Sequence, residues 1–148
     1  MEVFTEEWAR ACCEALNQSE SYQASAATWE GEIILQMSAD EAQGVDADRA
    51  IYIDTHRGEC RRAHVAGDEE MEKAAFAFRA DPATWKRLLA REMEPVAAIM
   101  QGKLRLVRGN LFTLAKYAQA AKDMVAAAGG VGGTFPGDAV TQAPPTGA

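Results

Sequence analysis

Three side chains that could bind a metal, or act as a nucleophile with its base, are spaced four residues apart: His56, Cys60 and His64. Zinc prefers imidazole and thiolate ligands, and a cysteine beside a histidine is a common catalytic pair. If Cys60 and His64 share a strand, four residues of rise put them about 13 Å apart, too far for a common ion or a hydrogen bond. We therefore expect ordinary polar positions of a hairpin, with no catalytic residue, no metal site and no cofactor.

Six basic residues form two local groups: Arg57, Arg61 and Arg62, and Lys86, Arg87 and Arg91. Arginine binds phosphates and carboxylates through paired hydrogen bonds, so groups meeting at a cavity mouth could hold a CoA phosphate or a lipid carboxylate. The alternative is a solvated surface balanced by neighbouring acids. In a hairpin with a two-residue loop, Asp54 would pair with Arg61 across the strands.

The charge balance and the apolar runs restrict the class of protein. The 148 residues include 15 basic and 22 acidic residues, giving a net charge of -7. This acidity argues against a nucleic acid partner, which requires a clustered basic surface. The apolar runs are far shorter than the roughly 20 residues that span a bilayer, and the acidic N-terminus does not resemble a secretory signal. We expect a cytoplasmic protein, monomeric or homodimeric, without stable membrane insertion; transient membrane contact stays open.

The three cysteines, of which Cys12 and Cys13 are adjacent, suggest no disulfide framework. We expect free thiols, mostly packed in the interior.

Residue periodicity predicts an α+β domain. Apolar alternation predicts strands at 29–37, 49–55, 59–65, 73–79 and 103–108. Helical spacing and capping residues predict helices at 5–16, from Asp81-Pro82 onward, at 96–100 and at 111–127. This order is typical of a mostly antiparallel sheet covered by helices. The hairpin loop at 56–58 fixes the register of its strands, and two registers stay open.

Glycine and proline mark the expected end of the domain. Six of the 12 glycines and three of the 5 prolines lie in the last twenty residues. We expect one domain over 1–128 and a flexible tail over 129–148. The alternative is that Phe135 folds back over the mouth of a pocket.

Residues 94–114, EPVAAIMQGKLRLVRGNLFTL, resemble the signature of the sterol carrier protein 2 (SCP-2) family. That signature has an acid-Pro pair, a short apolar helix, Gly-Lys, an alternating strand, and a Gly-Asn or Gly-Asp pair before the last helix. Further positions extend the similarity to small single-domain bacterial members over about 3–127: Trp8, Leu16-Asn17, Tyr22, Trp29-Glu30-Gly31, the hairpin, Asp81 and Trp85.

The resemblance implies a five-stranded, mostly antiparallel sheet covered on one side by helices, with an apolar tunnel between them. It implies non-catalytic binding of a fatty acid, a fatty acyl-CoA, a sterol-like molecule or a phospholipid. By position, the lipid-binding residues are Ile33, Leu35, Ile51, Ile53, Phe76, Phe78, Trp85, Leu88, Leu89, Ile99, Met100, Leu104, Leu106, Leu111, Leu114 and Tyr117. The chain ends in Pro-Pro-Thr-Gly-Ala instead of a Ser-Lys-Leu address, so peroxisomal import is not expected.

Two alternatives to a lipid carrier stay open. One is an enzyme or enzyme-accessory domain acting on an acyl or polycyclic substrate, which needs His56 or His64 beside a carboxylate inside the pocket. The other is an interaction module whose pocket is filled by its own side chains. A ligand site needs a cavity of about 300 to 1,000 Å³, whereas an ordinary core is closely packed.

Overall fold

Helix α1 (Glu6–Gln18) begins at the predicted cap and lies against the sheet. The Thr5 hydroxyl accepts a hydrogen bond from the Trp8 N–H, which satisfies one of the free donors at the start of the helix. Trp8, Cys12 and Leu16 recur at a spacing of four and form the buried stripe of α1. In this computed structural model, which describes residues 1–138, a six-residue helix α2 (Glu20–Ser25) follows directly.

Five strands form one mixed sheet in the order β3-β2-β1-β4-β5. Their bounds are β1 (Glu30–Met37), β2 (Arg49–His56), β3 (Glu59–Val65), β4 (Phe76–Ala80) and β5 (Arg105–Arg108). β1 and β4 are parallel, and the other three pairs are antiparallel. The predicted α+β class and the mostly antiparallel sheet are confirmed.

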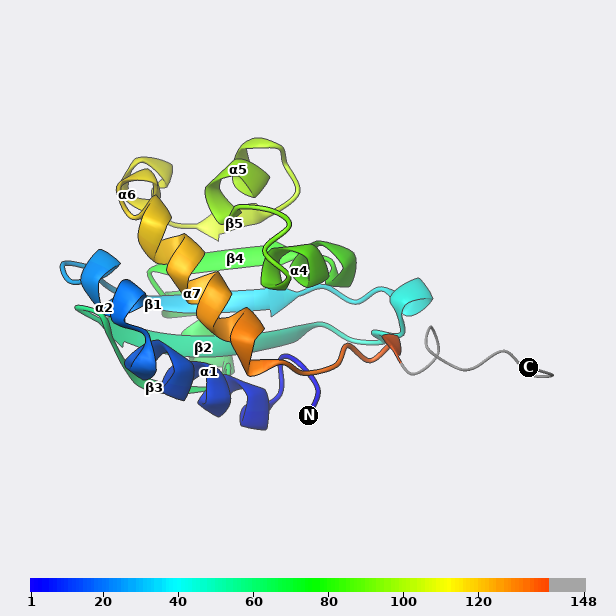
Figure 1. Ribbon diagram of the computed structural model, residues 1–148. Helices are drawn as coiled ribbons and strands as arrows, with labels where there is room; N and C mark the ends of the chain where they lie inside the picture. The colour runs from blue at the N-terminus through cyan, green and yellow to red at the C-terminus, as the bar shows by residue number, and fades with distance from the viewer. Residues whose placement is uncertain (139–148) are drawn as a thin grey trace.

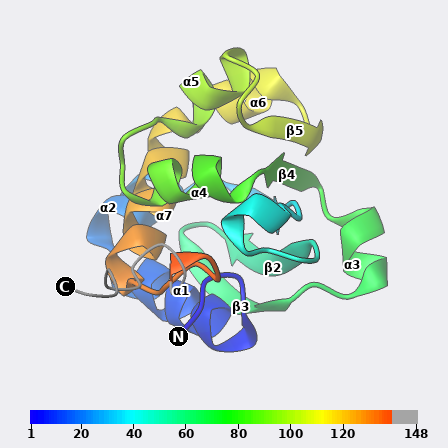
Figure 2. The same cartoon turned by 90° about the vertical axis from the view of Figure 1, so that its right-hand side faces the viewer.

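The larger core lies between one face of this sheet and a layer of helices (Figure 1). Ile33 and Met37 of β1 point into this core, as strand alternation requires. Ile34 points the other way and packs with Tyr52 and Ala77 on the opposite face. That face is flanked by a short helix that the sequence did not predict, α3 (Asp68–Lys73), which stands on the far side of the sheet from α7 (Figure 2).

The hairpin between β2 and β3 has a two-residue turn at Arg57-Gly58, where both residues have positive φ. Such a turn would place Asp54 opposite Arg61, but a bulge between Asp54 and Thr55 shifts the partner to Arg62. The Asp54 carboxylate binds both arginines, at 3.1 Å from Arg61 Nη2 and 3.6 Å from Arg62 Nε.

The second half of the chain contributes the remaining helices, α4 (Pro82–Leu89), α5 (Pro95–Met100), α6 (Leu111–Lys116) and α7 (Ala118–Val131). Asp81 and Asn110 cap α4 and α6 by accepting hydrogen bonds from the N–H groups of Thr84 and Thr113. The prediction of one continuous helix over 111–127 is wrong, because the chain bends at Tyr117, which leaves helical geometry. A short 3-10 turn, η1 (Glu41–Gln43), lies in the predicted loop between β1 and β2.

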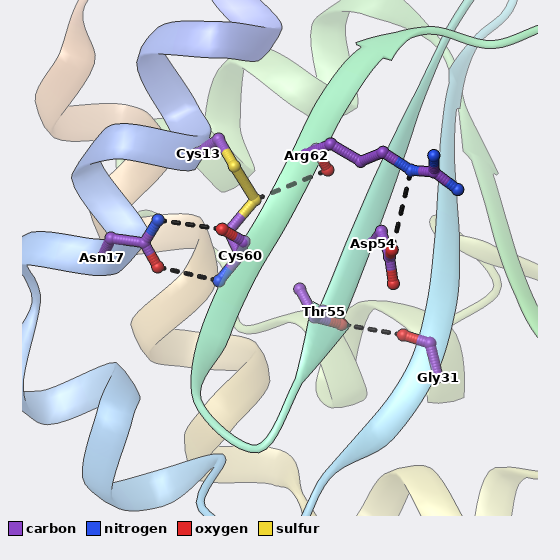
Figure 3. The surroundings of a disulfide bond; sticks show 7 residues. All are labelled: Cys13, Asn17, Gly31, Asp54, Thr55, Cys60 and Arg62. Carbon is purple, nitrogen blue, oxygen red and sulfur yellow. Dashed lines mark hydrogen bonds and ion pairs between the residues drawn. A yellow bond between two sulfur atoms is a disulfide. The ribbon is translucent and has the colours of Figure 1, made fainter.

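A disulfide joins Cys13 of α1 to Cys60 of β3 (Figure 3), so the expectation of three free thiols is wrong. Successive residues of a helix point about 100° apart. Cys12 therefore lies buried in the core as a free thiol, whereas Cys13 faces the edge strand. The sequence carries no signal for this pairing, because its partners are 47 residues apart.

Helix α7 continues through Gly129-Gly130 to Val131, past the end expected for it near residue 127. Beyond it, the Val3 N–H donates to the Thr134 carbonyl, and the Thr134 N–H donates to the Met1 carbonyl. Phe135 is buried, and its N–H donates to the Asp138 carboxylate. These contacts differ from the flexible tail expected to begin at residue 129; residues 139–148 of that tail lie outside the described residues.

Candidate functional site

An apolar cavity of about 60 Å³ lies between the sheet and the helices. Its floor comes from inward-facing strand residues, Ile33 and Leu35 of β1 and Phe78 of β4. Its walls come from Trp85 and Leu88 of α4, Leu114 of α6, and Tyr22, Trp29, Pro95, Leu104 and Tyr117. Helix α7 forms the roof with Ala120, Ala121, Met124 and Val125, which share one side of the helix.

The polar atoms of these walls form hydrogen bonds with other parts of the protein. Trp85 Nε1 donates to the Gln36 carbonyl at 2.9 Å, and Trp29 Nε1 donates to Thr55 Oγ1 at 3.0 Å. The Tyr117 hydroxyl lies 2.9 Å from Thr28 Oγ1. Burial raises the pKa of Tyr22 to about 12, so that residue stays neutral at ordinary pH. The cavity therefore offers an uncharged, apolar environment that suits hydrocarbon.

A second apolar cavity, of about 30 Å³, adjoins the first. It is lined by Trp8, Cys12, Leu16, Ile51, Ile53, Leu89 and Ala128, together with four residues that also line the larger cavity: Leu35, Trp85, Met124 and Val125. These four side chains form the partition between the two spaces. Met124 has the most flexible side chain of the four, because it is unbranched and has three rotatable bonds.

The sixteen predicted lining residues lie in four kinds of place. Eight line the larger cavity: Ile33, Leu35, Phe78, Trp85, Leu88, Leu104, Leu114 and Tyr117. Ile51, Ile53 and Leu89 line the smaller one. Phe76, Ile99 and Leu106 pack in or against the core without lining either cavity, and Met100 and Leu111 lie on the surface.

Met100 and Leu111 are therefore not where the sequence placed them. Pro95 and Ala98 are the buried residues of α5, and Met100, two residues after Ala98, is rotated by about 200° away from it. Leu111 is the first residue of α6, and Leu114 is the buried one.

The sequence-based list omitted all four roof residues of α7. Ala121, Met124 and Val125 recur at helical spacing after Leu114, so the signal for them was present. Trp29 shares strand parity with Ile33 and Leu35, which also points to the cavity face. Tyr22 had no comparable signal, because α2 is too short to show a periodic pattern.

The histidines and cysteines do not form a metal or catalytic cluster. Cys60 is in the disulfide, His64 Nε2 lies 2.8 Å from Glu70 Oε2, and His56 Nδ1 lies 3.7 Å from Glu30. Within the described part of the chain, no group of three His, Cys, Asp or Glu residues could hold a metal ion. Burial raises the pKa of the free thiol Cys12 to about 12, far from that of an active nucleophile.

The basic groups do not meet at the cavity. Arg57 pairs with Glu30 at 3.3 Å, and Arg61 and Arg62 pair with Asp54. Lys86 binds Asp138 at 2.6 Å, with its ammonium over the ring of Phe135. Phe135 lies beside Lys86 and Pro82 and does not line the apolar cavity.

A larger, open depression of about 500 Å³ lies between the N-terminal segment and the ends of β2 and β3. Its charged groups already have partners: Arg49 binds Glu2 at 3.0 Å, and Asp48 binds Arg79 at 3.2 Å. We therefore take the apolar cavity between the sheet and the helices as the candidate site.

The solved structures that resemble the chain include the following three. A crystal structure of sterol carrier protein 2 is 42% identical, with a TM-score of 0.78 over 86% of this chain and 97% of its own. The solution structure of a conserved hypothetical protein of Thermus thermophilus, described as a candidate sterol carrier protein, is 41% identical. Its TM-score is 0.80 over 90% of this chain and 92% of its own.

Sterol carrier protein 2 from Yarrowia lipolytica, in its apo form, is 15% identical, with a TM-score of 0.56 over 82% of this chain and 87% of its own; it supports the fold alone. Among curated proteins, the comparison finds no match. No helix within residues 1–138 is long and apolar enough to cross a membrane. The model of the SCP-2 sterol transfer family matches residues 12–122. The chain therefore belongs to the SCP-2 sterol transfer family.

Proposed function

We propose that the chain binds one apolar or acyl-bearing lipid between its sheet and helix α7, as a carrier or sequestering protein without catalysis. Candidate ligands are a fatty acid, a fatty acyl-CoA, a sterol-like molecule and a phospholipid. The observation that carries the proposal is the uninterrupted apolar lining that Ile33, Leu35 and Phe78 form with Met124 and Val125. The two solved relatives above 40% identity are described as a sterol carrier and a candidate sterol carrier.

Binding requires the cavity to enlarge. A volume of about 60 Å³ is below the roughly 300 Å³ of ordinary ligand sites. The Met124 side chain can adopt other rotamers and so join this space to the 30 Å³ cavity behind it. An empty cavity of 60 Å³ costs about 1.4 kcal/mol of stability at 24 cal/mol per Å³, and a lipid chain would recover that free energy.

The cavity chemistry supports binding over catalysis. The lining residues include no histidine, carboxylate, lysine or arginine, and both histidines pair with carboxylates elsewhere. An enzyme acting on an acyl or polycyclic substrate would need a nucleophile or a base at the cavity wall. The only thiol of the smaller cavity is Cys12, whose pKa is raised to about 12.

The small volume favours one competing function, an interaction module whose pocket is filled by its own side chains. Two measurements separate it from the carrier. Native mass spectrometry of protein purified without added lipid would detect a co-purifying ligand as added mass, lost on denaturation. Titration with a fluorescent polyene fatty acid would detect saturable binding. We expect a ligand and one binding site; ligand-free protein that gives no saturable fluorescence would exclude the carrier.

A further inference from the structure

The end of the molecule formed by α5, β5 and α6 carries most of the large apolar side chains that the described residues expose. Phe112 is 84% exposed, Met100 72%, Val107 50% and Leu111 37%. Figures 1 and 2 both place α5, β5 and α6 together at one end, away from α1. Four such side chains at one end are unusual, since scattered single residues are the norm on a monomer surface.

The charge of this region is opposite to that of the rest of the protein. Residues 95–122 contain five basic residues and no acidic residue, in a chain whose net charge is -7. Three of the five lie beside the exposed apolar residues in sequence: Lys103, Arg105 and Lys116, all exposed.

These three basic side chains also lack the carboxylate partners that are usual elsewhere in the molecule. Outside 95–122, eight of the ten lysines and arginines pair with an acid. Among residues 1–138, Lys103, Arg105 and Lys116 have no carboxylate within 4.0 Å, whereas Lys122 pairs with Glu94. Their charge is therefore available to an external anionic surface.

We propose that this surface, defined by Met100, Lys103, Arg105, Val107, Leu111, Phe112 and Lys116 and here called the α5–α6 face, docks the protein on an anionic lipid bilayer. Exposed apolar side chains beside unpaired basic ones match the interfacial region of a membrane, where hydrocarbon lies beneath anionic headgroups. An anionic bilayer can bury the apolar side chains and pair with the basic ones at the same time. This inference goes beyond the ligand of the cavity and does not require that the cavity hold a lipid.

The α5–α6 face adjoins the apolar cavity, so docking would bring the membrane close to the candidate site. Two leucines that line the larger cavity lie beside residues of this face in sequence. Leu104 directly follows Lys103, and Leu114 lies two residues after Phe112. Docking would therefore place the headgroup region next to the elements that close this side of the cavity.

Vesicle sedimentation tests the proposal with the full chain. We expect binding to vesicles of equimolar phosphatidylcholine and phosphatidylglycerol, little binding to pure phosphatidylcholine, and weakening by added salt. Each basic residue near an anionic surface contributes about 1 kcal/mol, or fivefold in affinity, so the double reversal K103E/K116E should weaken binding at least about 25-fold. The matched control R10E/K73E makes the same change in net charge on α1 and α3 and should bind as the wild type does.

The apolar part is tested separately. Phe112→Ala should weaken vesicle binding about tenfold, whereas Val65→Ala, at an exposed position on β3, should not. In Phe112→Trp, the new indole should shift its emission to the blue on vesicle binding and be quenched by brominated lipid. Circular dichroism confirms that each variant folds.

Three results would overturn the proposal: equal binding to neutral and anionic vesicles, equal losses for K103E/K116E and its control, or dimerisation of the wild type that Phe112→Ala abolishes without any vesicle binding. The last result would identify a second copy of the chain as the partner. Fatty acid titration in the absence of vesicles reports on the cavity alone, so the failure of one proposal is distinguishable from failure of the other.

Discussion

The Asn17 side chain forms both backbone hydrogen bonds of Cys60: Nδ2 donates to the Cys60 carbonyl at 2.9 Å, and the Cys60 N–H donates to Oδ1 at 2.8 Å (Figure 3). A side-chain amide from α1 thus takes the place of a neighbouring strand along the outer edge of β3. This arrangement satisfies backbone groups that an edge strand would otherwise leave open.

Replacing Asn17 with Asp should lower the free energy of unfolding by about 1 kcal/mol. The carboxylate keeps the acceptor for the Cys60 N–H but loses the donor, and it faces the Cys60 carbonyl oxygen. Urea unfolding followed by tryptophan fluorescence measures the change. Gln18→Glu, at the adjacent exposed position, makes the same chemical change and should leave the midpoint unchanged.

The disulfide between Cys13 and Cys60 should be detectable by thiol counting. Without reductant, a thiol reagent should label no cysteine in the folded protein and one, the buried Cys12, in the unfolded protein. After reduction, the unfolded protein should give three. Three reactive thiols without reductant would contradict the pairing.

The same disulfide should contribute strongly to stability. For a sequence separation of 47, the chain-entropy relation gives about 4 kcal/mol. We expect reductant to lower the urea midpoint of the wild type. The double variant C13S/C60S should have the lower midpoint from the start and should not respond to reductant.

Met124 should control the capacity of the cavity. Met124→Ala removes the flexible part of the partition and should join the two cavities, so that fatty acid binds more tightly at some cost in stability. Met124→Trp should fill the space and weaken binding at least about tenfold. Met71→Ala and Met71→Trp are the matched controls, because Met71 packs on the opposite face of the sheet. Equal fatty acid affinities in all four variants would place the ligand elsewhere.

Alanine substitutions at two adjacent glycines of α7, Gly129 and Gly130, should change the stability of the protein in opposite directions. A Cβ at Gly129 would overlap the Leu89 carbonyl of α4, whereas a Cβ at Gly130 would meet open space. Gly129→Ala should destabilise the protein by about 1 to 3 kcal/mol through overpacking. Gly130→Ala should stabilise it by up to about 1 kcal/mol, since alanine is favoured over glycine inside a helix. Thermal unfolding of the two variants in parallel should show a lower melting temperature for Gly129→Ala and a higher one for Gly130→Ala than for the wild type.

The ion pair between Asp138 and Lys86 should make the free energy of unfolding depend on pH. The Lys86 ammonium and the Phe135 N–H lower the pKa of the Asp138 carboxyl. The Asp138 carboxyl therefore binds a proton less tightly in the folded state than in the unfolded state. The resulting stabilisation is complete above the unfolded pKa of about 4. It is lost as the pH falls through the lower pKa that Asp138 has in the folded state. Wild type should be more stable than Asp138→Asn at neutral pH, and the difference should shrink in acid. Asp46→Asn, at an exposed position, is the matched control for the loss of one carboxylate.

Strong periodicity and caps allowed most of the fold to be predicted. Ile33 and Leu35 of β1 share one strand parity, as do Ile51 and Ile53 of β2. Asp81-Pro82 and Gly109-Asn110 mark helix starts that the structure contains. Helices α2 and α3 were missed because each has only six residues, which make fewer than two turns and show no periodic apolar stripe. The break at Tyr117 was missed because the apolar spacing continues across it from Leu114 to Ala121.

Features that depend on distant parts of the chain could not be derived from local pattern. Cys13 and Cys60 meet only because α1 lies along β3. The close approach of Gly129 to Leu89 likewise depends on how α7 crosses α4, and the glycine had suggested only the end of a domain. The volume of the cavity depends on side-chain packing, which periodicity does not determine.

Within residues 1–138, helix α7 follows every other helix and strand, yet it contacts α1, α2, α4 and α5 (Figure 1). During synthesis from the N-terminus, the apolar face of the sheet is complete before its roof exists. The nascent chain must therefore keep Ile33, Leu35 and Phe78 without their α7 cover until α7 itself leaves the ribosome. We expect this interval to be when the protein is most prone to aggregation and most dependent on chaperones.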